Sequence, residues 1–248
     1  MKILALIPAR LASSRFPGKP MMPILGKPMI GHVYEKVSKS LFLDKVAVAT
    51  CDQQIKEYIE SIGGEAIITS DKHERASDRC AEALLKIESK ENIKYDIVVM
   101  IQGDEPMIHS DMIDEAVAPM LENSEINVIN LMSQILNEAD IQDRNCIKVV
   151  FDFNNDALYF SREPIPTRIN LPNFKVYKQV CVIPFKRDFL IEYTNLSPTP
   201  LELAESVDMM RILEHGFKVH MKETSYETQA VDTQEDLIKV EKAMRKNL

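Results

Sequence analysis

Five consecutive apolar residues, 97–101, end abruptly at the polar run Gln102-Gly103-Asp104-Glu105-Pro106. A strand that is apolar at every position buries both of its faces, which is typical of a central strand in a parallel sheet covered by helices. Similar apolar runs occupy residues 3–7, 46–50 and 66–69, and segments with the helical spacing of apolar residues lie between them. This alternation predicts an α/β fold with a mostly parallel central sheet flanked by helices.

The second half of the chain has a different pattern. The segment KVVFDFNNDALYFSR holds two extended runs around Asn154-Asn155 and predicts a hairpin. The segment TPLELAESVDMMRILEHG predicts one helix ending at Gly216, and residues 218–221 predict a further strand. Thr233 and Asp236 predict a capping box for the last helix. We expect a single domain over residues 1–248, in which this half extends the same sheet and adds a small lobe near 150–215.

Composition excludes several classes of function. Thirty-eight acidic and 30 basic residues give a net charge of −8, which disfavours nucleic-acid binding. No apolar stretch approaches the ~18 residues of a membrane span, and the five apolar residues after Met1-Lys2 are followed by Pro8, so we expect neither membrane insertion nor a signal peptide. Four cysteines without a C-x-x-C pair indicate reduced thiols in a cytoplasmic protein.

A basic loop follows the first predicted strand directly. In open α/β sheets, ligands bind beyond the carboxyl ends of the strands. Arginine offers a planar fork to phosphate oxygens, lysine offers a point charge, and small residues let backbone amides approach an anion. The loop therefore predicts a triphosphate site, although a solvated basic loop would have the same composition. Its candidate residues are Arg10, Ser13, Ser14, Arg15 and Lys19.

Two aspartates are candidate ligands for Mg²⁺. Asp104 follows the predicted central strand, and Asp232 opens the last predicted helix. Mg²⁺ takes few protein ligands together with phosphate oxygens, so two carboxylates near a triphosphate suit it. Each aspartate also has a purely structural interpretation, as a turn residue or as a helix N-cap.

Several other catalytic classes lack their motifs. The five histidines form no H-E-x-x-H and no zinc spacing, and no G-x-S-x-G is present for a serine hydrolase. The sequence also contains neither G-x-G-x-x-G nor G-x-x-x-x-G-K-[ST], so a Rossmann fingerprint and a Walker loop are both absent.

Four segments together resemble the 3-deoxy-manno-octulosonate (Kdo) cytidylyltransferases, the CMP-Kdo synthetases. They are IPARLASSRFPGKPMMPILGKPMI, IQGDEPMI, ALYFSREPIP and VDTQEDL, and they occur in the order of that family over nearly the whole chain. The resemblance implies a GT-A-like nucleotidyltransferase fold, a sugar-binding and dimerisation lobe near residues 150–215, and a homodimer. It also implies an enzyme that couples CTP to Kdo with Mg²⁺, giving CMP-Kdo and pyrophosphate for lipopolysaccharide biosynthesis.

The resemblance also assigns roles to single residues. Arg10, Arg15 and Lys19 match triphosphate-binding residues and, with Asp104, form the catalytic set. Asp104 and Asp232 match the Mg²⁺ ligands. The implied substrate contacts are Ser13, Ser14, Ser77, Arg79, Gln102, Arg162, Gln179, Glu205 and Asp208.

Three positions depart from the family pattern. H-x-S-G-T-[DE]-R becomes the segment 73–79, HERASDR, and T-D-D or T-D-H becomes Thr50-Cys51-Asp52. H-L-G-x-Y becomes the segment 179–183, QVCVI, so a neutral glutamine replaces a titratable histidine. The sugar is therefore either ordinary Kdo or a relative altered at its tail, such as 8-amino-Kdo.

Other functions stay open at the level of sequence. A cytidylyltransferase for a sialic-acid-like sugar, a glycosyltransferase and an inactive nucleotide-binding regulator all suit this fold. Glycosyltransferases usually have a D-x-D motif after the central strand. This chain has Gly103-Asp104-Glu105-Pro106 there, which disfavours a glycosyltransferase. The chain keeps both candidate metal ligands and the three basic residues Arg10, Arg15 and Lys19, which disfavours an inactive regulator.

Overall fold

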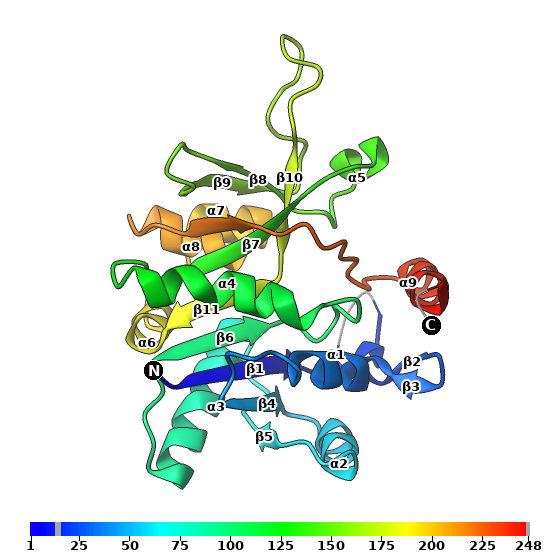
Figure 1. Ribbon diagram of the computed structural model, residues 1–248, viewed down its shortest axis with the longest axis vertical. Coiled ribbons are helices and arrows are strands. Elements are labelled where there is room, and N and C mark those ends of the chain that lie inside the picture. Colours follow the sequence, from blue (N-terminus) through cyan, green and yellow to red (C-terminus); the bar gives the residue numbers. More distant parts are fainter. Residues whose placement is uncertain (13–15, 247–248) are drawn as a thin grey trace. The chain divides into compact units, whose positions relative to one another are not determined.

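The computed structural model describes residues 1–12 and 16–246 of the 248-residue chain. The chain divides into two compact units, which are coloured by sequence in Figure 1. The first unit comprises Met1–Asp114 and Glu227–Leu248, and the second comprises Glu115–Tyr226. The lobe expected near residues 150–215 lies within the second unit.

The first unit contains a parallel sheet. Its strands β1 (Ile3–Ala9), β4 (Lys45–Thr50), β5 (Ala66–Ile68) and β6 (Ile97–Ile101) lie in the order β6-β1-β4-β5. All five residues of β6 are buried, as its unbroken apolar run predicts. The strands expected at 3–7, 46–50, 66–69 and 97–101 are all confirmed, with ends that differ by at most two residues.

Helices connect these strands. The elements of the first unit besides its sheet are η1 (Lys19–Met21), β2 (Pro23–Ile24), β3 (Lys27–Pro28), α1 (Met29–Val37), α2 (Gln53–Ser61), α3 (Ala76–Glu91) and α9 (Gln234–Lys246). Helix α4 (Ser110–Glu122) begins in the first unit and ends in the second. Thr233 and Asp236 form the expected capping box at α9, with Thr233 N donating to Asp236 Oδ2 at 3.0 Å and Asp236 N donating to Thr233 Oγ1 at 3.2 Å.

Strand order in this sheet fixes where a ligand can bind. The chain builds β1, β4 and β5 outward in one direction, and then α3 carries it back to β6 on the other side of β1. The carboxyl ends of β1 and β6 therefore lie side by side at the point where the direction reverses. Such a switch point leaves a crevice for ligands in open α/β sheets.

The second unit contains a five-stranded mixed sheet of its own, in the order β12-β7-β10-β8-β9. Only β12 and β7 are parallel. Its elements are β7 (Ile129–Gln134), α5 (Glu138–Gln142), β8 (Lys148–Phe151), β9 (Ala157–Ser161), β10 (Tyr177–Val180), β11 (Val182–Lys186), α6 (Arg187–Thr194), α7 (Pro200–Glu205), α8 (Asp208–Glu214) and β12 (His220–Glu223). The expected hairpin is confirmed as β8 and β9. Contrary to the expectation of one extended sheet, β7, β8, β9, β10 and β12 form a sheet of their own.

Two further expectations need correction. The single helix expected up to Gly216 is two helices, α7 and α8, because Ser206 adopts a left-handed conformation with φ of 53°. The guanidinium of Arg162 accounts for the break, since it binds the backbone oxygens of Glu205 and Ser206 at the end of α7. The last strand, expected at 218–221, begins two residues later at His220.

All four cysteines are free thiols. Within residues 1–12 and 16–246, every helix is too short or too polar to cross a lipid bilayer.

Candidate active site

The turn after β6 packs closely against β1. A β-carbon placed on Gly103 would lie 3.0 Å from the side chain of Ile30 and 3.2 Å from the backbone oxygen of Pro8. Because Pro8 belongs to β1, only glycine lets the two strand ends approach this closely. Gly103 therefore brings the chain that carries Gln102 and Asp104 to the switch point.

Three residues that are distant in the sequence meet at this edge of the first unit. Lys19 Nζ lies 2.7 Å from Asp104 Oδ2 and 3.2 Å from Asp232 Oδ1. The side chains are 11%, 20% and 15% exposed, so all three are largely shielded from water. The sequence predicted the two aspartates as ligands of one Mg²⁺ and Lys19 as a phosphate contact, and the structure brings all three side chains together.

Each of the three residues is held by its backbone. Lys19 begins η1, where its amide donates to Phe16 O and the next residue, Pro20, is buried. Val231 N donates to Asp104 O at 2.9 Å, which ties the segment before α9 to the turn after β6. Asp232 N donates to Asp236 Oδ2 at 3.2 Å, so the cap of α9 also sets the position of Asp232.

The charges in this cluster favour an ionised lysine. Burial opposes the charge of Lys19, but the carboxylates of Asp104 and, less strongly, Asp232 outweigh it. The pKa of Lys19 therefore lies above its usual value, and the ammonium is present at neutral pH.

The other predicted phosphate contacts lie next to this cluster in sequence. Arg10 follows β1, is exposed, and has Nη1 3.4 Å from the backbone oxygen of His73. Ser13, Ser14 and Arg15 lie outside the described residues. Sequence reasoning missed Asp52, whose Oδ2 accepts from Leu11 N at 2.8 Å and thereby holds the start of the basic loop. Its position directly after β4, at the same sheet edge as Asp104, was the available signal.

Arg79 is a buried cation with incomplete pairing. It projects from α3, is 2% exposed, and donates from Nη1 to Thr69 Oγ1 at 2.6 Å. Its Nη2 atom is buried and has no hydrogen-bond partner among the described residues. Ser77, two residues earlier in the same turn of α3, is fully buried. A buried guanidinium nitrogen without an acceptor is costly, so this position is suited to a ligand oxygen or nitrogen that accepts a hydrogen bond.

Glu82 holds the loop that precedes α3. Its Oε2 accepts from Ser70 N at 2.9 Å and also bonds His73 Nε2, while Oε1 pairs with Lys86 at 2.6 Å. Burial opposes the charge, but these partners outweigh it and lower the pKa of Glu82 to about 2. The departure from the family pattern at residues 73–79 therefore spans the end of this anchored loop and the first turn of α3.

Two predicted substrate contacts of the second unit, Arg162 and Glu205, bind each other. Arg162 N donates to Glu205 Oε2 at 2.8 Å, and Arg162 Nε donates to Glu205 O at 2.6 Å. The remaining guanidinium nitrogens of Arg162 donate to Arg144 O at 2.9 Å and Ser206 O at 3.3 Å. Glu205 Oε1 accepts from the hydroxyls of Tyr159 and Ser161, each at 3.1 Å. Both side chains therefore fasten the end of α7 to β9.

Gln179 is held by a fully buried asparagine. Its Nε2 donates to Asn130 Oδ1 at 2.6 Å, and Asn130 Nδ2 donates to Leu131 O at 2.7 Å and to Val180 O at 2.9 Å. Asn130 can present only its oxygen to Gln179, because its nitrogen faces two backbone carbonyls. Asp208 lies in the first turn of α8, where its backbone oxygen accepts from Tyr193 Oη at 3.1 Å.

A buried lysine escaped the sequence analysis. Lys148, on β8, has no exposed surface, and its Nζ donates to Asp143 O at 2.9 Å, Cys146 O at 2.7 Å and Arg162 O at 2.5 Å. Burial lowers the pKa of Lys148 below its usual value. In sequence it is one lysine in an extended run, and nothing there distinguishes it from a surface residue.

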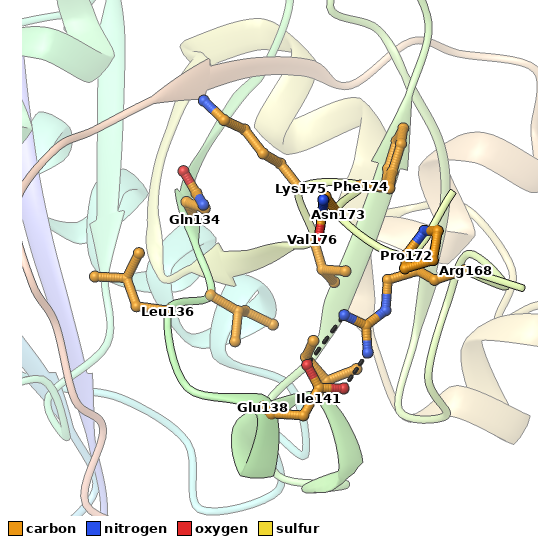
Figure 2. Close-up of a pocket in the computed structure, with 11 residues that line it drawn as sticks. Gln134, Leu136, Glu138, Ile141, Arg168, Pro172, Asn173, Phe174, Lys175 and Val176 are labelled. Carbon is orange, nitrogen blue, oxygen red and sulfur yellow. Dashed lines mark hydrogen bonds and ion pairs between the residues drawn. The ribbon is translucent and has the colours of Figure 1, made fainter. Parts of the chain in front are cut away.

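The second unit also contains a cavity of about 280 Å³, shown in Figure 2. An ion pair between Glu138 and Arg168 lies at one side, with Arg168 Nη1 3.0 Å from Glu138 Oε2. None of the predicted site residues lines this cavity. Its wall comes from residues 134–136, Glu138, Ile141, Arg168 and residues 172–176.

Comparison with known proteins places these features in a family. The family model described as "Cytidylyltransferase" matches residues 4–225. The 3-deoxy-manno-octulosonate cytidylyltransferase of Geobacter metallireducens is 44% identical, over 97% of this chain and 96% of the relative. The chain belongs to the 3-deoxy-manno-octulosonate cytidylyltransferase family. The member from Fusobacterium nucleatum is 40% identical, over 100% of this chain and 98% of the relative.

Solved structures agree with this membership. A CMP:2-keto-3-deoxy-manno-octonic acid synthetase complexed with CTP matches with a TM-score of 0.90 and 35% identity, covering 100% of both chains. A 4-diphosphocytidyl-2C-methyl-D-erythritol synthase from Anaerococcus prevotii matches with a TM-score of 0.64 and 13% identity, over 98% of this chain and 99% of that one, which shows the fold alone. The expected α/β nucleotidyltransferase fold and the resemblance to the Kdo cytidylyltransferases are confirmed, and the chain is an enzyme of the cytidylyltransferase class.

Proposed function

We propose that this member of the Kdo cytidylyltransferase family transfers the cytidylyl group of CTP to Kdo. The observation that carries this proposal is the convergence of Asp104 and Asp232 on one cation at the switch point of the first unit. The anomeric hydroxyl oxygen of the sugar attacks the α-phosphorus, and the bond from that phosphorus to its bridging oxygen breaks. Pyrophosphate leaves, the hydroxyl proton passes to solvent, and CMP-Kdo for lipopolysaccharide biosynthesis remains.

The two aspartates fit a divalent cation. Their carboxylates already share a positive charge, that of Lys19. Among the described residues, no group of three or more His, Cys, Asp and Glu side chains is placed to hold a metal. Mg²⁺ needs no such group, because it takes one or two carboxylates together with phosphate oxygens. Bound by Asp104 and Asp232, Mg²⁺ would neutralise charge on the phosphate oxygens of CTP.

The basic loop is proposed to bind the β- and γ-phosphates. Lys19, Arg10 and Arg15 supply charge-assisted hydrogen bonds, which are stronger than those between neutral groups. Because pyrophosphate gains charge as it leaves, cations in this position stabilise the transition state more than the ground state. Lys19 is fixed by η1 and already lies beside the aspartates, which supports its place at the reacting phosphates.

Arg79 is proposed to contact the cytosine ring. Its buried Nη2 has no described partner, and cytosine offers two acceptors, O2 and N3, on one edge. Ser77, buried in the same turn of α3, and Gln102, directly after β6, are proposed to contact the nucleotide and the sugar respectively. A base that lacks a suitably placed acceptor would leave this guanidinium unpaired, which would favour CTP over other nucleotides.

In the second unit, Arg162, Gln179, Glu205 and Asp208 remain proposed sugar residues. The guanidinium of Arg162 binds three backbone oxygens, so we propose that Arg162 acts by holding the end of α7 and Glu205. The side-chain nitrogen of Gln179 donates to Asn130, so the side-chain oxygen of Gln179 is the atom that can accept a hydrogen bond from a ligand. Both a hydroxyl of Kdo and the amino group of 8-amino-Kdo can donate to this oxygen, so 8-amino-Kdo stays a second candidate substrate.

The assembly and compartment are also proposals. A long loop, residues 162–176, projects from the second unit between β9 and β10 (Figure 1). Its apolar residues Ile169, Leu171 and Phe174 are 86%, 59% and 44% exposed, which supports a homodimer that covers them. Free thiols support a cytoplasmic location.

Pyrophosphate release tests the activity. Purified protein is given CTP and Mg²⁺, alone and with Kdo, 8-amino-Kdo or N-acetylneuraminate. We expect release only when a sugar is present, and kcat/KM of ~10⁴ M⁻¹s⁻¹ or more for the true substrate. Release without sugar indicates a hydrolase, release with N-acetylneuraminate alone indicates the sialic-acid rival, and no release with any sugar supports an inactive regulator.

A further inference from the structure

Lys19 occupies the place between the two carboxylates where a divalent cation would bind. Its ammonium is 2.7 Å from Asp104 Oδ2 and 3.2 Å from Asp232 Oδ1, which are hydrogen-bond distances rather than distant electrostatic contacts. With all three side chains at most 20% exposed, water screens this interaction only weakly. The ammonium of Lys19 thus balances one of the two negative charges of these carboxylates.

A metal that binds Asp104 Oδ2 and Asp232 Oδ1 competes with Lys19 for these two oxygens. Mg²⁺ binds carboxylate oxygens at about 2.1 Å, and an ammonium hydrogen-bonded to the same oxygens would lie next to a doubly charged ion. The backbone of Lys19 is held by η1 and by buried Pro20, whereas its side chain has four rotatable carbon–carbon bonds. The side chain is therefore the part that moves.

We propose that Lys19 is a resident counter-ion, which keeps divalent cations away from Asp104 and Asp232 until a triphosphate draws its ammonium away. This inference rests on the proposed function and adds a coupling between the binding of the divalent cation and the binding of the triphosphate. A polyphosphate binds Lys19, its departure exposes the carboxylates, and the metal then binds them. By linkage, the metal raises the affinity for the polyphosphate by the same factor.

Binding of Mn²⁺ to the free protein, followed by electron paramagnetic resonance, tests the proposal without nucleotide and without turnover. Lys19→Met removes the ammonium and keeps the length of the chain, and Lys19→Arg keeps the charge. Lys27→Met is the matched control, because Lys27 forms an exposed pair with Glu35 in the same unit. We expect Lys19→Met to bind Mn²⁺ about tenfold more tightly, or better, than the wild type, with Lys19→Arg and Lys27→Met close to the wild type.

Two further measurements keep the test decisive. The double variant Lys19→Met/Asp104→Asn must lose the added Mn²⁺ affinity, which assigns that affinity to these carboxylates. In thermal melts, Mg²⁺ should raise the Tm of Lys19→Met more than that of the wild type, and Lys19→Gln replaces Lys19→Met if the latter does not fold. If the wild type and the Lys19 variants bind Mn²⁺ equally tightly, Lys19 is not a counter-ion. If the wild type at the same time releases pyrophosphate with CTP and sugar, the proposed function still stands.

Discussion

The amide of Val231 donates to the carbonyl oxygen of Asp104 at 2.9 Å. This bond joins the turn after the central strand β6 to the residue before Asp232, so one backbone contact sets the spacing of the two carboxylates. Pre-set spacing lets both act on one cation without reorganisation, which is the property that electrostatic catalysis requires.

Asp104→Asn and Asp232→Asn are each expected to lower kcat by at least ~100-fold. Each keeps the shape of the side chain but removes a charge that stabilises the transition state. Steady-state pyrophosphate release at saturating Mg²⁺ checks this, with Asp111→Asn in the exposed first turn of α4 as the control. If Asp104→Asn turns over at a near-normal rate, Asp104 is not a ligand of the metal.

Arg79→Met is expected to weaken CTP binding by ~10-fold or more and to reduce the preference for CTP over UTP. A buried hydrogen bond from a charged group contributes about 1.5–3 kcal/mol, which supports this magnitude. Calorimetric titration with each nucleotide measures both effects. Thr69→Val, which removes the partner of Arg79 Nη1 but keeps the guanidinium, should change base preference less. If Arg79→Met prefers CTP over UTP as strongly as the wild type does, Arg79 has a packing role and does not contact the base.

Glu82 should make part of the stability depend on acid pH. Its folded pKa of about 2 lies below the usual value of 4.5 for a glutamate, so its contribution is present above pH 4.5 and is lost as pH falls through about 2. Urea unfolding at pH 6 and pH 3 should therefore show a smaller loss of stability for Glu82→Gln than for the wild type. The difference should be about 1–2 kcal/mol, because the carboxylate is partly solvated. Glu60→Gln, in an exposed pair with Lys56, is the control and should leave the wild-type pH dependence intact.

Lys148→Met is expected to destabilise the protein by roughly 3 kcal/mol, because three backbone oxygens lose their donor. Lys178→Met, at the position paired with Lys148 on the next strand, is the matched control. Chemical denaturation measures both variants. Equal stability of Lys148→Met and the wild type would show that water or a shifted loop replaces the ammonium.

Local patterns in the sequence predicted the first unit well. The apolar run at 97–101 identified β6, and Thr233 with Asp236 identified the start of α9. Both signals arise from neighbouring residues, so no tertiary information is needed. The candidate residues Lys19, Asp104 and Asp232 were also found in this way, although their mutual contact was not.

Features that depend on distant contacts could not be predicted. The break at Ser206 depends on Arg162, which reaches the end of α7 from the end of β9. The role of Lys148 depends in part on the carbonyl oxygen of Arg162, which lies beyond the next strand, and the orientation of Gln179 depends on Asn130. In each case a polar side chain satisfies the backbone or an amide of another element, and a single sequence carries no record of that pairing.

Phosphorus-31 nuclear magnetic resonance on the wild-type protein tests the central claim most directly. The sample contains CTP, Kdo and Mg²⁺, and spectra are recorded as CTP is consumed. The account predicts that the three CTP resonances are replaced by one phosphodiester resonance of CMP-Kdo and by pyrophosphate, in a 1:1 molar ratio. Conversion of CTP to CDP and phosphate or to CMP and pyrophosphate, or an unchanged CTP spectrum, would contradict it.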